Sequence, residues 1–114
     1  MNRQLTMLIV DDMEVERISF AEIFKDEYQI LEAENGKQAM EQLEQQKVHI
    51  VLLDLCMPVM DGFEVIREMK QQDKYADIPI VAKTAIDEKT EVKALEAGAD
   101  EYIKLFSQLE FIFN

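Results

Sequence analysis

The sequence predicts one α/β domain built on a parallel β-sheet. Apolar runs of strand length alternate with stretches whose apolar residues recur at helical spacing, which is the pattern of successive β-α-β units. Two runs, residues 7–10 and 50–53, are apolar throughout instead of alternating with polar residues. Such strands are typical of sheets that helices cover on both faces. Both runs end at an acidic side chain, which places charge at the carboxyl end of a buried strand.

The first three predicted strands are linked by two amphipathic helices. The strands are identified by their apolar runs, and the helices by apolar residues that recur every three or four positions. Asn35-Gly36 favours a sharp turn at the start of the second helix. The predicted order is strand 5–10, helix 13–25, strand 29–33, helix 36–46 and strand 49–54. The helix residues expected in the core are Val15, Ile18, Phe24, Ala39, Met40 and Leu43.

The second half of the chain repeats this pattern. Asp61-Gly62 favours a turn before a third helix, whose Ile66 and Met69 are expected to face the core. The remaining elements are helix 63–72, strand 79–83, helix 87–97, strand 101–104 and a short helix from residue 107. Five strands and five helices suit a chain of this length. Residues 1–114 are therefore interpreted as a single domain with a short or truncated final helix.

The composition limits the classes of partner. The chain has 24 acidic and 12 basic residues and a net charge of −12, which disfavours direct binding to nucleic acid or to an anionic membrane. Its apolar runs are far shorter than the roughly 20 residues of a membrane span, and the N-terminus lacks a signal-peptide pattern. The single cysteine, Cys56, excludes an internal disulfide. These features predict a soluble cytoplasmic protein.

Three carboxylates follow the two fully apolar strands. Asp11 and Asp12 come directly after residues 7–10, and Asp54 comes after residues 50–53. The carboxyl ends of parallel strands share one edge of the sheet, where open α/β sheets bind their ligands. Because like charges need a cation to share a site, the sequence predicts a hard divalent metal there. The alternative is local: each acid could instead cap the helix or turn that follows it.

Longer motifs surround these acids. They are Val10-Asp11-Asp12, Leu-Asp-Leu-Cys-Met-Pro-Val-Met-Asp-Gly at 53–62, Pro-Ile-Val-Ala-Lys-Thr-Ala at 79–85 and Ala-Leu-Glu-Ala-Gly-Ala-Asp-Glu-Tyr-Ile at 94–103. Together they resemble the receiver domains of bacterial response regulators, of the chemotaxis-regulator type, over nearly the whole chain. The resemblance implies a doubly wound, flavodoxin-like three-layer sandwich, with five parallel strands in the order 2-1-3-4-5.

The resemblance also implies a function in two-component signalling. Asp54 would accept a phosphoryl group from a histidine kinase or a phosphotransfer protein and form an acyl phosphate on the protein itself. Such a chain is a self-phosphorylating signalling domain rather than a turnover enzyme. The phosphoryl group would switch the face formed by residues 87–97, residues 101–104 and the final helix. A homodimer or a fused output domain would be contacted through that face.

Mg²⁺ is the cofactor that the resemblance implies, which agrees with the preference of this ion for oxygen ligands and retained waters. Its expected ligands are Asp11, Asp12, Asp54 and the backbone carbonyl of Cys56. Thr84 and Lys104 are expected to bind the phosphoryl oxygens. Thr84 and Tyr102 are the expected switch, in which the loop after Thr84 closes and the ring of Tyr102 changes position. Lys83, one residue before Thr84, is expected to point away from the phosphate.

The fifth-strand motif departs from the family pattern. Tyr102 and Lys104 are two residues apart, where receivers usually have a spacing of three and a proline after the lysine. Strand alternation then places both side chains on one face, unless a bulge or bend redirects Lys104 to the phosphate. Lys104 could also be an ordinary solvated lysine.

Other functions compete with signalling by phosphorylation. The main alternative is a degenerate receiver that is not phosphorylated and acts as a protein-interaction module. An aspartyl-phosphate phosphatase is disfavoured because the chain has no Asp-x-Asp nucleophile motif. A flavodoxin-like electron carrier is disfavoured because no Gly/Thr-rich phosphate loop follows the first strand.

Two positions predict slow loss of the phosphoryl group. Cys56 lies two residues after Asp54 and Ile86 two residues after Thr84, and neither side chain can orient an attacking water as an amide or carboxylate would. After phosphorylation and removal of the donor in Mg²⁺ buffer, intact-mass measurements should show a long-lived adduct. Loss of the adduct within seconds, with release of phosphate, would contradict this expectation.

Overall fold

The helices and strands follow the predicted order. The computed structural model describes residues 4–55, 57, 60–84 and 88–104, with the backbone alone described at 84, 88–91 and 102–104. Its elements are β1 (Leu5–Val10), α1 (Glu14–Phe24), β2 (Tyr28–Ala33), α2 (Gly36–Gln45), β3 (Ile50–Asp54), α3 (Gly62–Lys70), α4 (Asp73–Ala76), β4 (Ile80–Thr84), α5 (Glu88–Ala97) and β5 (Glu101–Lys104). The single turn of α4 was not predicted, and the expected helix from residue 107 lies outside the described residues.

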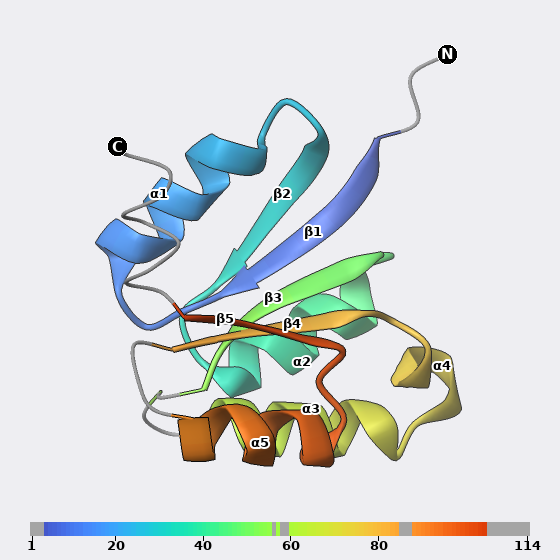
Figure 1. Ribbon diagram of the computed structural model, residues 1–114. Coiled ribbons are helices and arrows are strands. Elements are labelled where there is room, and N and C mark those ends of the chain that lie inside the picture. Colours follow the sequence, from blue (N-terminus) through green and yellow to red (C-terminus); the bar gives the residue numbers. More distant parts are fainter. Residues whose placement is uncertain (1–3, 56, 58–59, 85–87, 105–114) are drawn as a thin grey trace.

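The five strands form one parallel sheet in the order β2-β1-β3-β4-β5. Figure 1 shows α1 over one face of this sheet and α2, α3 and α5 over the other. The predicted three-layer architecture and strand order are therefore confirmed. None of the helices in the described part of the chain is long and apolar enough to cross a bilayer.

Two apolar clusters fill the space between the layers. The larger one lies under α2, α3 and α5 and includes Leu43, Ile66 and Met69, as expected. The smaller one lies under α1, and its buried members are Met7, Ile9, Phe20 and Leu52. Burial of a large apolar side chain contributes about 1.5–3 kcal/mol to the free energy of folding, so these clusters hold the helices against the sheet.

The prediction for the buried face of α1 is wrong at Val15 and Ile18, whereas Phe24 packs against the core as expected. Val15 is 74% exposed and Ile18 is 52% exposed, whereas Phe20 is the buried apolar residue of this helix. The predicted helix is correct, but at its amino end the wrong face was expected to be buried. Two charged residues, Glu16 and Arg17, occupy inward positions near the start of α1, because their partners lie at the carboxyl edge of the sheet.

The start of α3 is packed directly against the end of β3. Asp61 caps this helix, its Oδ1 accepting a hydrogen bond of 3.0 Å from the backbone amide of Glu64. A Cβ atom on Gly62 would lie 2.4 Å from the backbone oxygen of Asp54 and 2.6 Å from the Cα atom of Leu55. Both neighbours are backbone atoms that no rotamer change can move. Glycine is therefore required where the helix meets the strand.

We expect Gly62→Ala to lower the free energy of unfolding by about 1–3 kcal/mol, the usual cost of forcing atoms into a filled space. At an open helical position the same change would instead stabilise the fold by up to about 1 kcal/mol, because alanine has the higher helix propensity. The sign of the change in a urea denaturation experiment therefore tests the packing. A stabilised variant would show that there is room at this junction.

Candidate metal site at the carboxyl edge of the sheet

The three predicted carboxylates converge at the ends of two neighbouring strands. β1 and β3 are paired in parallel with Val10 opposite Leu53, so the acids that follow meet at one edge. Asp11, Asp12 and Asp54 each offer a carboxylate oxygen, and these oxygens lie within 4.8 Å of one another. Asp11 is fully buried and Asp54 is 8% exposed, whereas Asp12 is exposed to solvent. The expectation that these acids share one site is consistent with this geometry.

Strand alternation brings a lysine to the same place. The sheet register pairs Asp54 with Lys83, so both side chains project from the face that α1 covers. The residues two positions before Asp11, Asp54 and Lys83 are Ile9, Leu52 and Val81, which all belong to the cluster under α1. The expectation that Lys83 points away from the phosphate is therefore wrong, because its side chain lies on the same face as that of Asp54, the expected phosphoacceptor. The prediction was made relative to Thr84, the next residue along the chain. The sheet register instead relates Lys83 to Asp54, which lies beside it on the neighbouring strand.

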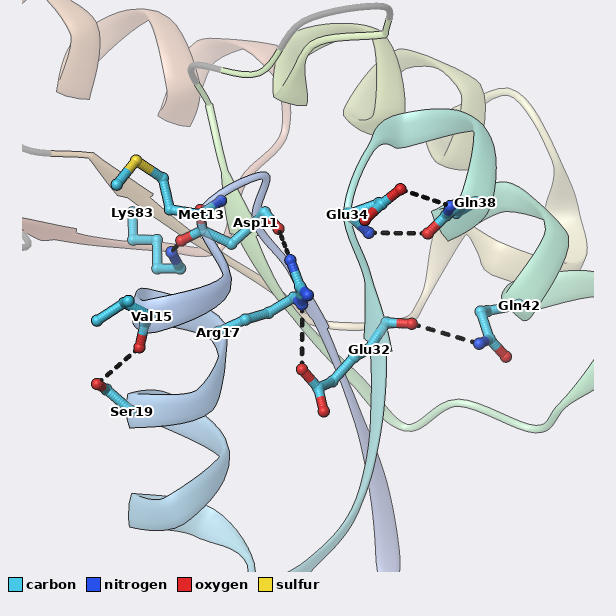
Figure 2. Close-up of polar contacts among 10 residues, drawn as sticks. All are labelled: Asp11, Met13, Val15, Arg17, Ser19, Glu32, Glu34, Gln38, Gln42 and Lys83. Atoms are coloured by element: carbon cyan, nitrogen blue, oxygen red, sulfur yellow. Dashed lines mark hydrogen bonds and ion pairs between the residues drawn. The ribbon is translucent and has the colours of Figure 1, made fainter.

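Lys83 forms a buried ion pair with Asp11. The Nζ atom of Lys83 donates to Oδ2 of Asp11 (Figure 2). The two side chains are 1% and 0% exposed. The other oxygen of Asp11 accepts a hydrogen bond of 2.9 Å from the backbone amide of Met13. The ammonium group also lies 5.0 Å from the centroid of the Phe20 ring, a favourable cation–π distance. Both charges are thus satisfied within the protein.

The ion pair determines the charge state of Asp11. Burial would raise the pKa of Asp11, but the hydrogen bond and positive charge of Lys83, together with the Met13 amide, outweigh burial and hold this pKa below its ordinary value. The carboxyl group of Asp11 therefore stays ionised at neutral pH despite its burial.

A fourth carboxyl group, Glu16, joins the site from α1. Its Oε2 atom lies 3.9 Å from Nζ of Lys83, and its side chain is 26% exposed. Burial, followed by the hydrogen bond with Asp11 and the negative charge of Asp11, raises the pKa of Glu16 to about 7. Glu16 therefore exchanges a proton near neutral pH, unlike Asp11.

Sequence reasoning missed both Lys83 and Glu16 as members of the site. The available signal was Lys83 itself, because a lysine at the end of the apolar run Ile80-Val81-Ala82 must be buried or displaced, and a buried lysine needs an acid partner. Glu16 had a weaker signal. An acid in the first turn of a helix is ordinarily explained by the helix dipole alone.

Arg17 fixes the turn that carries the acids. Its Nη1 donates to the backbone oxygen of Asp11 at 2.8 Å, and its Nε donates to Oε1 of Glu32 on β2 at 3.0 Å (Figure 2). The backbone amide of Asp11 also donates to the carbonyl of Ala33 at 3.0 Å. The position of Asp11 is therefore set by contacts on both its backbone and its side chain.

The remaining predicted site residues are only partly described. Thr84 and Lys104 end β4 and β5 and are paired with each other, and Tyr102 is paired with Ala82. The register of β5 is unbroken through Lys104, so the bulge expected to redirect this residue is not present between residues 101 and 104. The side chains of Thr84, Tyr102 and Lys104, and all of Cys56, lie outside the described residues.

Comparison with known proteins places this geometry in context. Residues 7–110 match the family described as the response regulator receiver domain. The chemotaxis protein CheY of Halobacterium salinarum is 40% identical over 98 residues, which cover 85% of this chain and 81% of that protein. The phosphate regulon transcriptional regulatory protein PhoB of Pseudomonas aeruginosa is 39% identical over 94% of this chain, and histidine kinase P4 of Formosa agariphila is 39% identical over 93%. The chain spans 48% and 8% of the lengths of these last two proteins.

Solved structures give the same relationship. The receiver domain of a sensor histidine kinase from Pseudomonas aeruginosa has a TM-score of 0.80 and 27% identity, with 89% of this chain and 84% of that chain covered. Its description states that a magnesium ion is coordinated in its active site cleft. Chemotaxis protein CheY4 of Vibrio cholerae has a TM-score of 0.83 over 95% of this chain and 98% of that chain, and its 23% identity supports the fold alone.

We expect Asp11→Asn to lower the free energy of unfolding in metal-free buffer by about 3 kcal/mol, because Lys83 loses the partner of its buried charge. This is the low end of the usual cost, since Glu16 remains 3.9 Å from the ammonium group. Asp12→Asn is the matched control and should change stability by no more than about 0.5 kcal/mol, because Asp12 is exposed. Equal effects of the two variants in urea denaturation would contradict this assignment.

Proposed function

The chain belongs to the response regulator receiver domain family, and from this premise we propose that it is a cytoplasmic two-component signalling module phosphorylated on Asp54. The donor would be a histidine kinase or a phosphotransfer protein. The observation that carries the proposal is the convergence of three carboxylates, with oxygens within 4.8 Å of one another, at the ends of β1 and β3. Residues 1–114 would form this single receiver domain.

Asp54 is the residue best placed to act as the nucleophile. It is the last residue of β3, at the edge of the sheet where Asp11 and Asp12 also lie. One of its carboxylate oxygens would form the new bond to phosphorus while the bond from phosphorus to the donor nitrogen breaks. The donor imidazole, protonated on its other nitrogen, leaves neutral. The protein itself is then the acyl phosphate product.

The donor set suits a hard divalent ion such as Mg²⁺, which binds carboxylate oxygens and retains several waters. Asp12 and Asp54 would supply direct carboxylate ligands. Asp11 would act through water, because both its oxygens already accept hydrogen bonds, from Lys83 and from Met13. Family likeness adds the backbone carbonyl of Cys56. When bound, the ion would offset the charge that develops on the transferred phosphoryl group.

Phosphorylation would be transmitted through β4 and β5. By family likeness Thr84 and Lys104 would bind the phosphoryl oxygens, and closure of the loop after Thr84 would change the position of the Tyr102 ring. The output surface would consist of α5, β5 and the segment that follows residue 104. A second copy of the chain, or an output domain, would bind there. The length of PhoB, of which this chain spans 48%, is compatible with such an arrangement.

The regular register of β5 supports one second candidate. Lys104 lies at the register position of Thr84, whereas Asp54 is paired with Lys83, so the phosphoryl group could lack its usual lysine. A receiver without that contact could serve as an interaction module that is not phosphorylated. The two candidates differ in whether Asp54 reacts with a phosphoryl donor.

Incubation with acetyl phosphate and MgCl₂ should add the mass of one phosphoryl group to the protein and none to Asp54→Ala, as measured by intact mass spectrometry. Asp73→Ala is the matched control, because it removes an exposed aspartate of α4 and should leave the reaction intact. EDTA should suppress the adduct. An unmodified wild-type protein would instead favour the interaction module.

A further inference from the structure

The register and the ion pair together give Lys83 a role beyond packing. Lys83 is opposite Asp54 on the neighbouring strand and forms an ion pair with Asp11, so one ammonium group is bound to the acidic cluster of the candidate metal site. We propose that Lys83 is the resident cation of this site, which keeps Asp11 from coordinating a divalent ion directly and weakens the binding of that ion. This inference rests on the proposed function, because it concerns the same carboxylates.

The contacts of Asp11 support its removal from the ligand set. Its side chain is fully buried, and its two oxygens accept hydrogen bonds from Lys83 and from the Met13 amide. A divalent ion that bound Oδ2 of Asp11 directly would compete with Lys83, whose side chain is 1% exposed and lies against the Phe20 ring. Leaving a buried ammonium group without its acid partner is strongly unfavourable.

The charge of Lys83 also acts on the ligands that remain. The carboxylates of Asp12 and Asp54 lie within 4.8 Å of Asp11, which brings the ammonium group close to any ion that they hold. Repulsion between a unit charge and a divalent ion at such short range is large even at an effective dielectric constant of about 20. Lys83 therefore sets an upper limit on metal affinity and keeps the acids together when no metal is bound.

Two variants separate this role from a purely structural one. Lys83→Met removes the charge and keeps an apolar side chain of similar length, so Mg²⁺ should bind at least about tenfold more tightly. Asp11→Asn combined with Lys83→Met removes the whole pair without changing the net charge. If Asp11 is not a direct metal ligand, this double variant should bind Mg²⁺ within about threefold of wild type, since no direct ligand is lost and the local charge is unchanged.

The experiment is isothermal titration calorimetry of the metal-stripped full chain with MgCl₂, repeated as the shift in urea midpoint caused by MgCl₂. Lys47→Met is the matched control, because it removes one positive charge from an exposed position before β3, at the opposite end of that strand. Its affinity for Mg²⁺ should stay within about twofold of wild type, because exposed charges at that distance are screened.

The outcomes are distinct. Tighter binding by Lys83→Met, with the double variant close to wild type, supports the proposal. Unchanged or weaker binding by a folded Lys83→Met, or a loss of tenfold or more in the double variant, overturns it. If Lys83→Met does not fold without metal, the double variant decides, since buried ion pairs are often replaced by uncharged residues at little cost. If no variant binds Mg²⁺, the proposed metal site fails as well; if only Lys83→Met binds it, the role of Lys83 is still supported.

Discussion

The buried ion pair between Lys83 and Asp11 is the constraint on which the site depends. Two charges that are almost fully shielded from water are tolerated only when each is matched by the other and by further hydrogen bonds. That requirement fixes the end of β1 relative to β4, with β3 between them. The fold thus fixes the position of Asp11 through its ion pair with Lys83. The exposed Asp12 and the edge residue Asp54 complete the site beside this pair.

The same constraint explains the unusual start of α1. A helix over a sheet normally turns its apolar stripe inward, and farther along α1 Phe20 follows this rule. At the amino end of the helix the inward positions belong to Glu16 and Arg17, because they meet Lys83, Asp11 and Glu32. The apolar residues Val15 and Ile18 are consequently displaced to the surface. The chemistry of the sheet edge has determined which face of the helix is buried.

Much of this architecture was predictable from the sequence, and the two errors that concern the acidic site have one cause. Apolar runs and helical periods located the elements, and the shared edge of parallel strands brought Asp11, Asp12 and Asp54 together. The errors concern Lys83 and the inward face of α1. Both depend on a pairing between residues 72 positions apart, which local patterns do not contain. The register of β3 with β4 supplies the missing information, because it relates Lys83 to Asp54.

The fit of Gly62 against the end of β3 has a mechanical consequence. The amide of Gly62 donates to the carbonyl of Leu55, and the amide of Leu55 donates to the carbonyl of Lys83, each at 3.2 Å. Because this junction has no room for even one methyl group, the start of α3 and the end of β3 are in direct backbone contact. A displacement of the backbone at Asp54 would therefore move the start of α3 and tilt the helix, so that a change at the sheet edge also moves the carboxyl end of α3.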